Sequence, residues 1–160
     1  MNFYEFSQNN SGGEMIFNKK LTHRVFIEAR NAEKAKEEAI KLGVYFQGVD
    51  DGEDCPCCGD RWSEPNELIF PYRYGTLEKN EAEKIADKYK ADLGKTTWKF
   101  LGTHDSDPTK YDVIFRDVES YAQFITDKYG YWGWSNKNKQ VEARIFYKDK
   151  KMKEIISTPN

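Results

Sequence analysis

The first seventeen residues show two short runs of alternating polar and apolar side chains. Residues 2–6 alternate polar with aromatic side chains, and residues 14–17 form a second short run that ends in Ile16 and Phe17. Residues 7–13 (SQNNSGG) lie between the runs, and all of them are polar or small, as is typical of a tight turn. The pattern therefore predicts an antiparallel hairpin at the start of the chain.

Two later segments each combine a strand pattern with a helical pattern. Residues 22–29 predict a strand with Val25 and Ile27 on one face, followed by a helix that Asn31 caps and that ends at Gly43. Residues 111–115 predict another strand, followed by a helix over 118–129. The similarity of the two units allows a division into halves, 1–62 and 77–157, but no residue-level identity establishes a repeat. Two ordinary β-α units are the simpler interpretation.

The remaining segments complete an α+β pattern. They are a short edge strand at 44–46, an irregular or edge segment at 63–75 in which 67–70 pair with a sheet, a helix over 77–94, strands at 98–101 and 140–147, and a lysine-rich strand end or turn at 148–153. Because strands and helices alternate with hairpin signals, we predict a single α+β domain over 1–160. Its sheet is expected to be mostly antiparallel, with about three helices.

The composition of the chain argues against several classes of protein. The 160 residues carry 25 basic and 27 acidic side chains, so the net charge of -2 argues against a protein that binds long nucleic acid through overall positive charge. Aromatic residues make up 15% of the chain and supply large units of burial, which argues against a disordered chain. A membrane-spanning helix needs about 18 consecutive apolar residues, and no apolar run in this sequence comes near that length. The N-terminal residues also lack the pattern of a signal peptide. We expect a soluble protein of the cytoplasm.

Two segments carry candidate chemistry for a small ligand. In residues 7–13, glycines allow backbone amides to approach a ligand, and the Asn, Gln and Ser side chains match ribose hydroxyls or phosphate oxygens. In the second segment, the Arg61 guanidinium can bind a phosphate while adenine stacks on Trp62, and His23 and Arg24 lie on the predicted strand that follows the hairpin. The structural alternatives are a turn without a ligand, a packing tryptophan and a surface histidine.

The three cysteines all lie between positions 55 and 58. Cys55 and Cys58 have the spacing of half a zinc site, and Cys57 offers a third thiolate. A fourth ligand would be His23, His104 or an acid such as Asp54; the alternative is a tight turn with reduced cysteines. Since no cysteine lies elsewhere in the chain, a disulfide framework is not expected.

The sequence contains few motifs that would indicate catalysis. The chain has two histidines, no paired-histidine metal motif and no nucleophile elbow, so we expect binding and no enzymatic activity. Residues 129–136 (YGYWGWSN) concentrate four aromatic residues, which suit a stacking platform, a dimer contact or the closure of the core.

The segments FYEFSQNNSGG (3–13), THRVFIEA with its following helix, and DCPCCGDRW (54–62) resemble a family of small uncharacterised proteins of tailed bacteriophages, and YDVIFRDVESYAQF fits the same family. Small phage proteins of this kind often counter host defence. Among them are proteins that sequester nucleotide immune signals, such as the ADP-ribose derivatives of Thoeris or the cyclic dinucleotides of CBASS, with the Sequestin and Lockin families as examples.

The resemblance implies a phage anti-defence protein of the host cytoplasm that binds a nucleotide-derived signal without catalysis and forms a homo-oligomer. The candidate ligand-binding residues are Tyr4, Phe6, Asn9, Asn10, Ser11, Gly12, Gly13, His23, Arg24, Arg61 and Trp62. No cofactor is expected apart from structural zinc at Cys55, Cys57 and Cys58. The alternative is a small protein that inhibits a host protein through the aromatic segment 129–136. Whether residues 7–13 and 54–62 meet in space decides whether they form one site.

Overall fold

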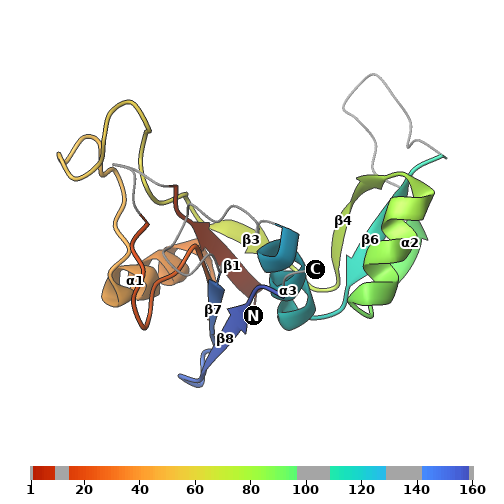
Figure 1. The fold of residues 1–160 in the computed structure, drawn as a ribbon. Coiled ribbons are helices and arrows are strands. Elements are labelled where there is room, and N and C mark those ends of the chain that lie inside the picture. The colour runs from red at the N-terminus through yellow and green to blue at the C-terminus, as the bar shows by residue number, and fades with distance from the viewer. Residues whose placement is uncertain (1, 10–14, 97–108, 129–141, 159–160) are drawn as a thin grey trace. The chain divides into compact units, whose positions relative to one another are not determined.

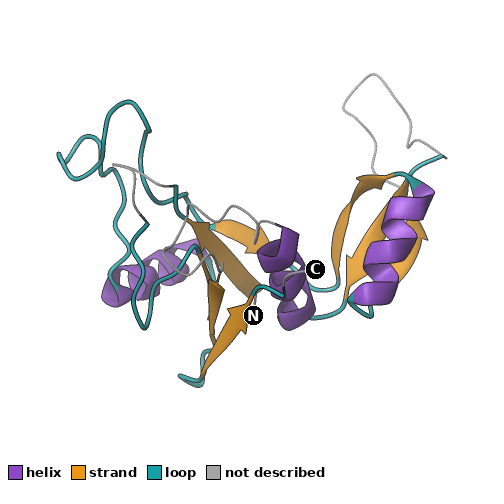
Figure 2. Cartoon of the chain, viewed as in Figure 1, coloured by secondary structure: helices purple, strands orange, loops and turns teal. Residues whose placement is uncertain are grey.

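The structure is a computed structural model that describes residues 2–9, 15–96, 109–128 and 142–158. These residues form three helices and eight strands, and the strands belong to a five-stranded and a three-stranded sheet (Figures 1 and 2). All strand pairs in the described residues are antiparallel except one. The predicted α+β class with a mostly antiparallel sheet and three helices is therefore confirmed.

Contacts between residues group the chain into two compact units, Met1–Ile69 with Ile125–Asn160, and Phe70–Phe124. The division into halves at 1–62 and 77–157 stays a prediction. In the described residues, no helix has both the length and the apolar character needed to span a membrane.

The larger sheet belongs to the first unit. Its strands are β1 (Asn2–Ser7), β2 (Arg24–Ala29), β3 (Asn66–Leu68), β7 (Glu142–Phe146) and β8 (Met152–Ile156), in the order β3-β1-β2-β7-β8. β2 and β7 form the one parallel pair. β2 lies at the centre, and Val25, Phe26 and Ile27 are all buried, because both faces of this strand are covered.

Helix α1 (Ala32–Leu42) packs against β2 and has the predicted caps. The Asn31 side chain accepts a hydrogen bond from the Lys34 backbone N–H at 2.9 Å. Gly43 ends the helix with a φ of 111°, a left-handed conformation that glycine adopts without a steric penalty from Cβ. Ala35 and Ala39 face the core beside Phe6.

The smaller sheet belongs to the second unit. It contains β4 (Tyr72–Leu77), β5 (Asp92–Lys95) and β6 (Tyr111–Phe115) in the order β4-β6-β5, and helix α2 (Lys79–Lys88) contacts all three strands. Helix α3 (Val118–Lys128) brings Tyr121 and Phe124 against Phe115, with ring centroids 5.4 and 5.2 Å away. Edge-on and stacked aromatic contacts therefore supply much of the core of this unit.

The N-terminal hairpin prediction is wrong in the described residues. β1 pairs with β2 and β3, and residues 15–17 have no strand structure. The Gln8 side chain explains the difference, since it accepts from the Ile16 backbone N–H at 2.9 Å and donates to the Ile16 carbonyl at 2.7 Å. An amide side chain thus satisfies both backbone groups of Ile16, which therefore need no strand partner.

Other boundaries also differ from the prediction. The helix predicted over 77–94 ends at Lys88, because Lys90 has a φ of 53° and the chain then enters β5. Residues 44–46 form no strand, and the lysine-rich segment at the end of the chain leads into the strand β8, which the pattern did not indicate. The predictions for 67–70, 111–115, 118–129 and 140–147 correspond to β3, β6, α3 and β7. The strand predicted at 98–101 lies outside the described residues.

Candidate functional site

The two motif segments meet at the end of β1. The backbone N–H of Asn9 donates to the Arg61 carbonyl at 2.9 Å, and the N–H of Ser63 donates to the Ser7 carbonyl at 2.8 Å. Gln8 and Trp62 form an isolated antiparallel bridge between these bonds. We call this contact region, residues 7–9 with 58–63, the junction. The described part of SQNNSGG therefore lies against DCPCCGDRW, whereas Asn10, Ser11, Gly12 and Gly13 lie outside the described residues.

The Asn9 side chain strengthens the junction. Its Nδ2 donates to the Asp60 carbonyl at 2.8 Å and to the Cys58 carbonyl at 3.2 Å. One amide group thus binds two carbonyls of the turn that follows the cysteines, and it fixes this turn relative to β1.

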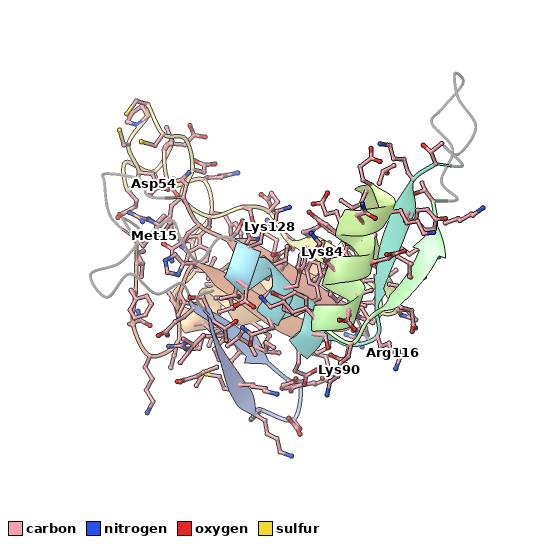
Figure 3. All side chains as sticks on the ribbon, turned by 45° about the vertical axis from the view of Figure 1, so that its right-hand side comes forward. Met15, Asp54, Lys84, Lys90, Arg116 and Lys128 are labelled. Atoms are coloured by element: carbon pink, nitrogen blue, oxygen red, sulfur yellow. The ribbon has the colours of Figure 1, made fainter. Side chains whose placement is uncertain are left out.

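Asp54 is the centre of the loop formed by residues 45–61, which we call the Asp54 loop (Figure 3). Its side chain is 1% exposed and accepts hydrogen bonds from the Tyr45 hydroxyl at 2.6 Å and the Arg61 backbone N–H at 2.8 Å. A Cβ at Gly48 would lie 1.9 Å from Asp54 Oδ2, so the carboxylate needs a glycine at this position. Burial, followed by the hydrogen bond with Asp54, raises the pKa of Tyr45.

Arg61 is held inside the same network. Its side chain is 10% exposed, and its Nε donates to the Tyr45 hydroxyl at 3.0 Å and lies 3.7 Å from Asp54 Oδ1. Its Nη1 lies 3.4 Å from Gln8 Oε1 and 3.5 Å from the Asn9 carbonyl. The guanidinium therefore joins the Asp54 loop to the polar end of β1, and its Nη1 contacts are long for hydrogen bonds.

The aromatic residues predicted to bind adenine belong to the hydrophobic core. Trp62 is 3% exposed, and Tyr4 and Phe6 pack with it in the core cluster of the first unit. A base cannot stack on a ring whose faces are already covered, so the stacking role predicted for these residues does not fit this structure. Phe17, which was predicted as part of a strand and not as a binding residue, is 41% exposed and lies beside His23.

His23 and Arg24 lie next to the junction, because Ser7 is opposite Arg24 in the register of β1 and β2. The Gln8 backbone N–H donates to the His23 carbonyl at 3.1 Å. The Arg24 guanidinium pairs with the buried carboxylate of Glu5. His23 is itself buried, and its Nδ1 lies 3.3 Å from the Glu142 backbone nitrogen. This environment does not suit an exposed general base.

The three cysteines form a compact group within the Asp54 loop. Their Sγ atoms all lie within 4.8 Å of one another, and none of the three forms a disulfide bond. The Cys58 backbone N–H donates to the Cys55 carbonyl at 3.1 Å, which closes the turn. This group is compatible with the predicted metal site, since thiolates at such distances can share one ion.

Contacts between the thiols alter their acidity. Hydrogen bonding to Cys57, and to a smaller extent to Cys58, lowers the pKa of Cys55, although burial acts in the opposite direction. Hydrogen bonds with Cys55 and Cys58 raise the pKa of Cys57 to about 11. The contact between Cys55 and Cys57 therefore favours the thiolate at Cys55 and the thiol at Cys57.

Charge differs between the two ends of the Asp54 loop. Asp50, Asp51 and Glu53 are exposed acids that precede the cysteines in the chain, and the exposed Asp60 follows them. The end of the loop that carries the cysteines is therefore negative, which favours a cation, whereas the arginines lie toward β1 and β2.

Comparison with family models matches Domain of unknown function (DUF7296) over residues 1–155. The chain belongs to the DUF7296 family. No curated protein and no solved structure matches it. The match covers both motif segments of the DUF7296 chain and therefore includes the whole described junction.

Two residues that build this site in the DUF7296 chain were not predicted from the sequence. Tyr45 was assigned to an edge strand, and Gly48 was not considered. Both lie against Asp54 in the structure. The only signal in the sequence was the glycine at position 48, six positions before Asp54. The aromatic segment 129–136 and His104 lie outside the described residues, so the roles proposed for them stay predictions.

Proposed function

We propose that the DUF7296 protein acts by binding a small nucleotide-derived molecule at the junction, without catalysing a reaction. The observation that carries this proposal is the contact between residues 7–9 and 58–63 through the Asn9 to Arg61 and Ser63 to Ser7 backbone hydrogen bonds. Segments about 50 residues apart thus bring amide side chains and a guanidinium to one place. The resemblance to small phage proteins supports a role in sequestering a host immune signal in the bacterial cytoplasm.

Arg61 is the residue most suited to bind the phosphates. The contacts of its Nη1 with Gln8 and Asn9, at 3.4 and 3.5 Å, are long for hydrogen bonds. A phosphate oxygen at about 2.8 Å would form a stronger, charge-assisted bond at the same atom. Tyr45 and Asp54 would keep the guanidinium oriented while the phosphate binds.

The base requires an aromatic surface that is not part of the core. Phe17 meets this condition because it is exposed and follows Ile16, whose backbone is bound to the Gln8 side chain. We therefore assign to Phe17 the stacking role first expected of Trp62, with Asn9 and Gln8 as donors and acceptors for ribose.

Native mass spectrometry of protein purified from cells with active nucleotide signalling tests the proposal directly. We expect a bound nucleotide that heating releases intact. Arg61→Ala should weaken its binding by about 1.5–3 kcal/mol, or about ten- to a hundredfold in Kd, because a charge-assisted bond is lost. Isothermal titration with the released molecule measures this change.

The control is Arg116→Ala, which removes an exposed arginine of the second unit that pairs with Asp92. Its affinity should equal that of the wild type. Because Arg61 also makes internal contacts, Arg61→Lys provides a check on folding, and it should recover part of the affinity. Wild-type affinity in folded Arg61→Ala would remove this residue from the site, and protein without a nucleotide that also ignores added nucleotides would contradict the proposed function.

A zinc ion at Cys55, Cys57 and Cys58 is the second part of the proposal, supported by the closeness of their Sγ atoms. We expect about one zinc per chain, measured by elemental analysis, and its loss from the triple cysteine-to-serine variant. A chelator should remove zinc while circular dichroism shows an intact fold, because Asp54 and the core hold the loop without the thiols. Equal zinc in the wild type and the serine variant would contradict this site.

A further inference from the structure

We infer that the cysteine group is an open three-thiolate metal site, whose fourth ligand is an exchangeable thiolate or imidazole from outside the chain. The inference rests on the metal site proposed above and adds its coordination. It depends on three features of the described residues, namely the exposure of the thiols, the occupation of the nearest other donors, and the rigidity of the turn.

The thiols lie at the protein surface. Cys57 and Cys58 are exposed and Cys55 is half-buried, so an ion bound to them would face solvent on its remaining side. Sγ of Cys57 and Sγ of Cys58 are 3.7 Å apart, close to the separation of two thiolates on one tetrahedral zinc with Zn–S bonds of about 2.3 Å. Cys55 Sγ lies 2.6 Å from Cys57 Sγ, closer than two thiolates on one ion, so these two side chains would have to separate to complete a face of three sulfur ligands.

His104 lies outside the described residues, and the other donors considered for the fourth position have different roles. Both Asp54 oxygens accept hydrogen bonds, one from the Tyr45 hydroxyl and one from the Arg61 backbone. Asp60 Oδ1 accepts from the Val49 backbone N–H at 3.0 Å. His23 is buried against Phe17 and the Glu142 backbone. Among the residues that the structure describes, the group within 4.8 Å contains the three cysteines and no fourth ligand.

The turn is held in place by groups that are not metal ligands. Asp54, the residue before Cys55, is anchored by the hydrogen bond that its carboxylate accepts from the Arg61 backbone N–H, and Asn9 binds the Cys58 carbonyl. Gly59 allows the turn to continue with a φ of 78°. An ion therefore meets thiols on a turn that is already held in place, and four-ligand coordination would require a donor from outside this turn. Structural zinc sites have four protein ligands, whereas three protein ligands leave a position for an exchangeable one.

Cobalt(II) is the probe, because its visible spectrum reports on the number of sulfur ligands and on the fourth donor. We expect one Co²⁺ per chain with sulfur-to-cobalt charge-transfer bands. Addition of 2-mercaptoethanol or imidazole should shift the ligand-field bands, since each of them would enter the fourth position. Zinc should displace the cobalt.

The controls separate this inference from the proposed metal site. Asp51→Asn, which changes an acid near the cysteines that is not a ligand, should bind Co²⁺ with the same spectrum, whereas Cys58→Ser should lose a sulfur band. Absence of Co²⁺ binding would contradict the metal site itself. If Co²⁺ binds with a four-ligand spectrum that added thiol and imidazole do not change, only the open coordination would be overturned. In that case, a changed spectrum in His104→Ala would identify His104 as the fourth ligand. One ion per two chains in native mass spectrometry would instead show that a second chain supplies it.

Discussion

Replacing Asp54 with alanine should lower the free energy of unfolding by about 3–5 kcal/mol, the cost of removing one partner from a buried charged pair. The variant leaves the Arg61 guanidinium and the Tyr45 hydroxyl without the carboxylate that both contact. It also removes the acceptor of the Arg61 backbone N–H. Urea denaturation measures the loss, and hydrogen exchange should locate the first increase in exchange within the Asp54 loop.

Two variants test the reason for this effect. Asp51→Ala changes an exposed acid of the same loop and should alter the stability by no more than about 0.5 kcal/mol. Asp54→Asn keeps the shape but not the charge, so its stability should lie between those of the wild type and Asp54→Ala. If Asp54→Ala and Asp51→Ala proved equally stable, the hydrogen-bond network would not hold the loop.

Trp62→Ala should also destabilise the protein by about 3–5 kcal/mol, because removal of a large buried aromatic side chain leaves a cavity. Trp62 is buried with Tyr4, Phe6 and Leu21 in the core of the first unit. The same substitution addresses function, since Trp62 was first expected to stack on adenine. A thermal unfolding curve measures the change in stability.

Phe17→Ala is the matched control, because Phe17 is an exposed aromatic residue near the same end of β1. We expect a change in stability of no more than about 0.5 kcal/mol and weaker binding of the nucleotide. The opposite pattern, a stable Trp62→Ala that no longer binds the ligand while Phe17→Ala binds normally, would return the stacking role to Trp62.

The accuracy of the sequence predictions depended on how local the responsible forces are. Helix α1 was predicted with both caps, because Asn31 and Gly43 act on backbone groups within a few residues of themselves. The helix predicted over 77–94 was too long, because the apolar spacing continues through Leu93 although that residue belongs to β5. Helical and strand periodicities overlap over such a short stretch.

In the candidate site, too, features that depend on near neighbours in the chain were predicted, and features that depend on distant partners were not. The cysteine group was predicted, since three residues within four positions must lie close together whatever the fold. The predicted role of Trp62 did not fit, because residue type does not reveal whether a tryptophan is exposed or buried. Tyr45 and Gly48 were missed because their importance comes from Asp54, a partner several positions away in an irregular loop.

The α+β class, the caps of α1 and the closeness of the three thiols were predictable from the amino-acid sequence, because they follow from hydrophobic periodicity or from neighbours along the chain. Three other features became apparent in the folded chain, namely the pairing of β1 with β2, the contact of residues 7–9 with residues 58–63, and the network in which Asp54 joins Tyr45 to Arg61. Contacts of this kind depend on which surfaces the whole chain buries together. Many pairings satisfy the same local pattern, so the pattern alone does not select among them.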